Sequence, residues 1–110
     1  EVVWLVPEPP DEVRRWWQTE YPDIAPITEK AAAVTGAGLD IVGHFTLPRE
    51  AWTLHFYEPI KARLGEFRRA WSGDAVGLAV IAELDLEIDM YERYSDVQGY
   101  EFFVARRPPL

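Results

Sequence analysis

Residues 39–47 read Leu-Asp-Ile-Val-Gly-His-Phe-Thr-Leu, and this stretch decides the fold class. Its odd-numbered positions are apolar or glycine, whereas its even-numbered positions mix polar and apolar side chains. Alternation with a period of two is typical of a β-strand with one apolar side. We therefore predict a strand over 39–47, ended by Pro48 because proline cannot donate to the hydrogen-bonded ladder.

Two further stretches, rich in β-branched and aromatic residues, predict strands near the ends of the chain. Glu1–Val6 is followed by prolines at positions 7, 9 and 10, and Tyr100–Ala105 precedes two arginines and two more prolines. The predicted sheet therefore has three strands, two of which come from the two ends of the chain.

Apolar residues at helical spacing predict two helices between the first strand and residues 39–47. The first begins after Pro10 and is closed by Tyr21-Pro22, because the residue before a proline avoids helical geometry. The second has Thr28 as its expected N-cap and ends at Gly36 or Gly38.

The same spacing predicts two long helices after Pro48. One runs to Trp71 and contains Pro59, which should kink or split it, and the other begins at Asp74, its expected N-cap. The predicted order of elements is β-α-α-β-α-α-β. We expect a single α/β domain over residues 1–110, an α+β fragment with a three-stranded mixed sheet and about four helices.

Composition and charge narrow the function classes. The 110 residues include 19 acidic and 11 basic side chains, for a formal net charge of -8, which opposes binding to nucleic acid or to anionic membranes. The chain has no cysteine, which excludes disulfides, thiolate metal sites and a cysteine nucleophile. Its apolar stretches are far shorter than the roughly 20 residues that span a bilayer, and no signal peptide opens it, so we expect a cytoplasmic protein.

The first residues carry two further expectations. The chain opens with Glu1 rather than methionine, inside a strand, from which we expect an excised fragment. A strand at the open edge of a sheet invites pairing with another chain. We therefore expect a dimer or larger assembly with Val2, Trp4 and Val6 near the interface.

Several segments agree in order and spacing with one group of bacterial enzymes. They are Trp4-Leu5, Pro9-Pro10, Val13, Trp16-Trp17, Glu20-Tyr21-Pro22, 38–48, Ala51-Trp52, Tyr57, Pro59, Ala62-Arg63-Leu64, 87–91 and Tyr94. Together they resemble the C-terminal half of a bacterial class I S-adenosylmethionine-dependent methyltransferase. The resemblance implies that 1–6, 39–47 and 100–105 are the fifth, sixth and seventh strands of that sheet, with the seventh antiparallel between the other two.

The resemblance also implies a function. The chain would be the substrate-binding and lid portion of a small-molecule methyltransferase, with the helices of about 48–95 as the lid and S-adenosylmethionine as the methyl donor of the intact parent. The family holds that cofactor with a Gly-rich turn after its first strand and an acidic residue ending its second, whereas Gly36-Ala37-Gly38 precedes a strand and marks a helix end. We therefore expect no cofactor bound to this chain alone, which would be inactive without the missing N-terminal half.

His44 is the candidate catalytic residue, as a base or a substrate contact. It lies close to the carboxyl end of its predicted strand, where open α/β sheets place ligands, and imidazoles titrate near neutral pH. The structural alternative is an imidazole that caps the strand or hydrogen-bonds a nearby loop. His55, on a predicted helix, is expected at the surface, and the spacing of the two histidines supports no metal site.

Aromatic residues exceed what a small core needs, and aromatic walls with polar tips are typical of ligand pockets. The alternative is that most of them pack in the core. The rival to a methyltransferase is therefore a complete small α+β module that binds a ligand or dimerises without catalysis. The predicted substrate-binding residues are Trp16, Trp17, Tyr21, Trp52, Tyr57, Tyr91 and Tyr94.

The expected lack of a cofactor site can be tested on the isolated chain. Isothermal titration calorimetry with S-adenosylmethionine should detect no binding tighter than millimolar, because the glycine turn and the acidic residue that would hold the cofactor lie outside these residues. Micromolar binding would contradict the interpretation of the chain as a portion without the cofactor site.

Overall fold

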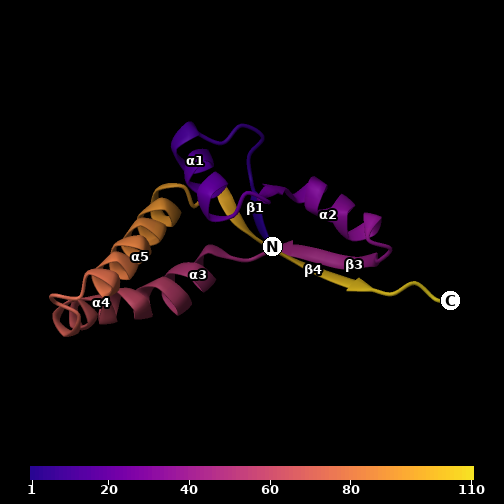
Figure 1. Ribbon diagram of the computed structural model, residues 1–110. Helices are drawn as coiled ribbons and strands as arrows, with labels where there is room; N and C mark the ends of the chain where they lie inside the picture. Colours follow the sequence, from indigo (N-terminus) through magenta and orange to yellow (C-terminus); the bar gives the residue numbers. More distant parts are fainter. The chain divides into compact units, whose positions relative to one another are not determined.

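The computed structural model describes residues 1–110 and divides into two compact units. The first combines Glu1–Leu47 with Tyr94–Leu110 and contains the sheet, and the second, Pro48–Arg93, is helical (Figure 1). No helix combines the length and the apolar character needed to cross a bilayer.

The sheet has four strands in the spatial order β2-β1-β4-β3. β4 lies between β1 and β3 and is antiparallel to both, which confirms the strand arrangement implied by the resemblance. The prediction of three strands is wrong, because β2 pairs with β1 through two residues only, one of them a proline, and so short a pairing leaves no pattern in the sequence. The strands are β1 (Val2–Trp4), β2 (Ala25–Pro26), β3 (Asp40–Thr46) and β4 (Gln98–Arg106).

An irregularity in β3 changes which side chains share a face. The pairing register with β4 shifts between Ile41 and Gly43, so Val42 is an extra residue in the ladder. Because a bulge offsets the alternation of side chains, the predicted apolar face of odd-numbered residues is wrong at Ile41, which lies on the face opposite to Phe45. Beyond the bulge the alternation holds to the end of the strand.

Two helices belong to the sheet unit, α1 (Asp11–Glu20) and α2 (Ile27–Gly36). α1 buries Val13 completely. α2 begins one residue before Thr28 and has no side-chain cap, so the predicted N-cap is wrong; Pro26 holds that position. Gly38, with a φ of 87°, makes the left-handed turn that leads into β3.

The two faces of the β3–β4 pair differ in what covers them. Glu1 lies opposite Glu101 in the ladder, and the Glu1 carboxylate pairs with Lys30 of α2, which places α2 on the face that carries Glu101. Figure 1 shows α2 alongside β3. The opposite face exposes Phe45 and Phe102, whose side chains are 53% and 46% exposed and whose rings stack at 5.4 Å. This pair is an apolar surface that the described chain leaves open to solvent.

The helical unit is one interrupted helical stretch followed by a separate helix: α3 (Arg49–Trp52), a π-helical turn (Thr53–Tyr57), α4 (Glu58–Ala70) and α5 (Ala75–Arg93). The π turn ends at Tyr57, two residues before Pro59, whose ring lacks an N–H and would crowd the carbonyl of His55 in a regular helix. The predicted interruption of the helix is thereby confirmed, and it lies just before Pro59. Asp74 caps α5 as predicted, since its Oδ1 accepts hydrogen bonds from the backbone N–H groups of Val76 and Gly77 at 3.0 and 3.1 Å.

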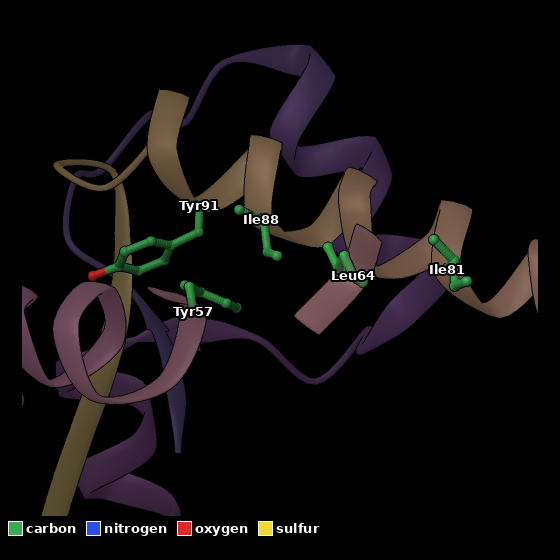
Figure 2. Packing of buried hydrophobic residues seen from close by; sticks show 5 residues of the cluster. All are labelled: Tyr57, Leu64, Ile81, Ile88 and Tyr91. Atoms are coloured by element: carbon green, nitrogen blue, oxygen red, sulfur yellow. The ribbon is translucent and has the colours of Figure 1, made fainter. Parts of the chain in front are cut away.

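The helical unit has a core of its own. Leu64 of α4 and Ile81 and Ile88 of α5 point between the two helices, together with Tyr57 and Tyr91 (Figure 2). These side chains are only 3–6% exposed. Burial of an aliphatic side chain of this size contributes about 1.5–3 kcal/mol, so this cluster is the main source of stability within the unit.

The helical core can be tested by truncating Ile88. Ile88→Ala should destabilise the unit by about 2–5 kcal/mol, because the removed methyl groups leave a cavity between α4 and α5. The control is Val76→Ala, since Val76 is 76% exposed, and it should change stability by less than about 0.5 kcal/mol. Urea unfolding followed by circular dichroism measures both, and similar small effects from the two variants would contradict the core.

Candidate functional site

The carboxylate of Glu101 is the most deeply buried polar group of the sheet unit, with 2% of its surface exposed. A charged group away from water needs hydrogen-bonding partners. Its Oε2 lies 2.6 Å from Nδ1 of His44, and its Oε1 accepts a hydrogen bond from the Thr46 hydroxyl at 2.5 Å. Both partners belong to β3. Each carboxylate oxygen of Glu101, a residue of β4, therefore makes a contact with the neighbouring strand.

The strand register explains why these groups meet. Thr46 lies directly opposite Glu101, and His44 lies opposite Phe103. Positions two apart on a strand share a face, so His44, Thr46 and Glu101 all point to the face that α2 adjoins. His44 was predicted from the sequence, whereas Glu101 was not. The available signal was a charged residue in the middle of an otherwise apolar strand, Tyr100–Ala105.

His44 combines a fixed ring with a side chain that is partly open to solvent. Its side chain is 44% exposed although its carboxylate partner is buried. Since Nδ1 faces Glu101, the second ring nitrogen, Nε2, is directed away from the carboxylate. The ring of Phe103 lies 5.5 Å from the imidazole and flanks it on the same face. A carboxylate that holds one nitrogen of an imidazole sets which nitrogen of the neutral ring is the free acceptor.

The predicted aromatic residues of α1 lie together, at a different position along the strands from His44. Trp16 and Trp17 are half-buried and meet edge to face, with ring centroids 4.8 Å apart. The indole N–H of Trp17 donates a hydrogen bond to the side chain of Gln98, which is 3% exposed, and the Tyr94 hydroxyl donates to the Glu12 carboxylate. These contacts hold α1 beside the carboxyl end of β1, because Trp4 pairs with Gln98.

His44 and the aromatic pair of α1 are therefore separated in two ways. His44 is level with Phe103, which lies about 17 Å along β4 from Gln98 at about 3.4 Å per residue. Gln98 and Glu101 also point to opposite faces, because they are an odd number of positions apart on the strand. The predicted groups do not line a single compact pocket in the sheet unit.

Tyr21, another predicted substrate contact, lies at a groove beside α2. Its hydroxyl donates a 2.8 Å hydrogen bond to the Glu1 carboxylate, and the Lys30 ammonium lies 5.2 Å from the centre of its ring. The Tyr21 hydrogen bond, aided by Lys30, holds the pKa of the Glu1 carboxyl below its ordinary value against the opposing effect of burial. The groove has a volume of about 560 Å³ and an apolar floor that includes Val34 and Leu39.

The three remaining predicted residues, Trp52, Tyr57 and Tyr91, come together in the helical unit. Their ring centroids are 5.3 to 6.0 Å apart, and the two tyrosines are 4% and 6% exposed. The Tyr57 hydroxyl donates to Glu87 at 3.1 Å. Burial, with the nearby negative charge of Glu87, raises the pKa of Tyr57. In this structure the three rings serve as packing surfaces of the helical core.

The connections that lead from a strand into a helix lack glycine. Three connections lead from a strand into a helix, namely 5–10 after β1, the direct junction of β2 with α2, and 47–48 after β3. None of them contains a glycine. The Gly38 turn has the opposite polarity, from helix to strand. No group of three or more His, Cys, Asp or Glu side chains is arranged to hold a metal ion.

Two solved structures share the fold of nearly the whole chain. The SAM-dependent methyltransferase from Geobacter sulfurreducens, in complex with S-adenosyl-L-homocysteine, is 19% identical and matches with a TM-score of 0.73 over 98% of this chain and 44% of its own. YjhP from E. coli is 18% identical and matches with a TM-score of 0.72 over 99% of this chain and 48% of its own. No protein-family model and no curated protein matches the sequence.

The chain thus spans less than half the length of either solved structure. At this identity the likeness establishes the fold. The strand order β1-β4-β3 agrees with the arrangement that the resemblance in the sequence implied. The chain therefore has the α/β fold of a part of a class I S-adenosylmethionine-dependent methyltransferase.

Proposed function

We propose that this chain is the substrate-binding and lid portion of an S-adenosylmethionine-dependent methyltransferase that acts on a small molecule. The observation that carries the proposal is the fold it shares with the Geobacter methyltransferase over 98% of its length. The segment order in the sequence supports its assignment to the C-terminal half. The glycine-free connections after its strands support a division of labour in which another part binds the methyl donor.

The acceptor molecule, in this proposal, is recognised by aromatic side chains. Trp16 and Trp17 are the best supported of the predicted contacts, because they are half-buried and stand beside the carboxyl end of β1, the end at which open α/β sheets bind ligands. The hydrogen bond to buried Gln98 fixes the Trp17 indole. The helical unit, Pro48–Arg93, would cover the acceptor as a lid.

His44 is the proposed proton acceptor. A hydroxyl or amine that receives a methyl group must lose a proton, and an imidazole whose ring is fixed and whose side chain is 44% exposed can take it. Because His44 and Trp17 lie at different levels and on opposite faces, an acceptor that contacts both must be extended and must pass the end of β3. The proposal therefore favours a chain-like acceptor over a single compact ring.

A second candidate is a module that binds or dimerises without catalysis. It is favoured by the exposed, stacked pair of Phe45 and Phe102, an apolar surface of the kind that mediates association. The open edge expected on β1 is partly covered, since β2 pairs with Val3 and Trp4. A Gly-rich strand-turn-helix segment in the same gene would favour the methyltransferase instead.

Replacing Trp17 tests acceptor binding. In an enzyme that contains this chain and a cofactor-binding part, Trp17→Ala should raise KM for the acceptor about tenfold or more with a smaller change in kcat, because a ground-state contact is lost. Trp17→Phe, which keeps a ring but loses the N–H, should be intermediate. Gln18→Ala, at an exposed position of the same helix, is the control. Transfer of a labelled methyl group to a panel of acceptors is the measurement, and an unchanged KM for Trp17→Ala would exclude the contact.

Replacing His44 tests the basic role. His44→Gln keeps a hydrogen-bonding side chain but removes the basic ring nitrogen, so a basic role predicts a loss of turnover of about 10²-fold or more. A structural role predicts a lower melting temperature with turnover nearly kept. His55→Gln, in the exposed histidine of the helical unit, is the matched control. Wild-type turnover of the His44 variant from pH 6 to 8 would rule out the base.

A further inference from the structure

We infer that Glu101 is the positioning residue of His44: its buried carboxylate accepts the Nδ1 proton of the neutral ring and so leaves Nε2 as the proton-accepting atom. The catalytic meaning of this inference rests on the proposed methyltransferase function. The assignment of the Nδ1 proton does not depend on that function, because it concerns only the side chains of His44, Thr46 and Glu101.

The position of the Glu101 carboxylate is fixed by contacts with its side chain and its backbone. One oxygen takes the Thr46 hydroxyl at 2.5 Å and the other faces Nδ1 of His44 at 2.6 Å. The backbone of Glu101 is fixed as well, since its N–H donates to the carbonyl of Glu1 at 2.8 Å. With 2% of the residue exposed, water does not compete for these contacts.

The identity of the partner decides the tautomer. An ionised carboxylate only accepts hydrogen bonds, so a neutral imidazole at 2.6 Å from it must place its single proton on Nδ1. The lone pair is then on Nε2, on the side of the ring that faces away from Glu101. The His44 side chain is 44% exposed, so an incoming group can reach this residue.

The same contact balances charge during proton transfer. For each methyl group that a neutral hydroxyl or amine gains, one proton leaves it, and Nε2 receives that proton. The ring then carries a positive charge, which the carboxylate of Glu101 stabilises at hydrogen-bond distance. This is the arrangement in which a buried acid orients a histidine without taking up the proton itself. The class of acceptor that fits is therefore one with a proton to lose.

The tautomer can be measured on the isolated chain. Long-range proton–nitrogen NMR correlations, recorded under conditions in which the spectrum itself shows a neutral ring, should show the proton of His44 on Nδ1. Glu101→Leu removes the acceptor at similar size and should move the proton toward Nε2, whereas Thr46→Val, which removes the other partner of Glu101, should keep it on Nδ1. If Glu101→Leu does not fold, the wild-type spectrum still decides, because a proton on Nε2 in the wild type overturns the inference.

A second arm separates this inference from the proposed function. Glu101→Gln keeps an acceptor oxygen for Nδ1 but removes the charge, so in the active enzyme kcat should fall about tenfold or more while KM changes little. A proton on Nδ1 together with full activity of the Gln variant would retain Glu101 as the residue that orients His44 and overturn its catalytic part. A proton on Nε2 in an active enzyme would refute the positioning while leaving the methyltransferase proposal intact.

Discussion

The sheet unit depends on the ladder that β4 forms with β1 on one side and β3 on the other. β3 has no other partner, and β1 has only the two-residue β2 besides. Glu1 and Glu101 exchange backbone hydrogen bonds of 3.0 and 2.8 Å, although 100 positions separate them. Closing so long a loop costs chain entropy, which is offset when the intervening segment is itself compact. The helical unit, with its own core between α4 and α5, meets that requirement within the segment that joins β3 to β4.

The buried glutamate is the costly member of that ladder. Removing a carboxylate from water is unfavourable by several kcal/mol unless its oxygens are satisfied, and the two contacts from β3 satisfy them. A valine at this position would join the same strands without that cost and with a better strand propensity. Glu101 is therefore better explained by its contact with His44 than by the stability of the sheet. Residues that conflict with local structural preference concentrate at functional sites.

Much of the fold could be predicted because it depends on repeating or local signals. The alternation over 39–47 indicated β3, and Asp74 and Pro59 each act within one turn of their own position, so the cap and the split helix were correct. The errors have a different origin. β2 and the bulge at Val42 are set by how strands meet in space, and Thr28 lost its expected capping place to the proline two residues earlier. Glu101 was missed for the same reason, because its partners are on another strand.

The aromatic residues show why composition alone could not locate a substrate site. In the helical unit the core includes Tyr57 and Tyr91, and Trp52 packs against it. Trp16 and Trp17 are half-buried beside β1. Residue type does not distinguish the two sets, and only packing does. The strand register then limits which acceptors can contact both His44 and the tryptophans of α1. A compact acceptor held against α1 cannot also touch an imidazole about 17 Å along β4 on the other face. Either the acceptor is extended around the end of β3, or only one of the two groups contacts it, and the shape of the acceptor decides between them.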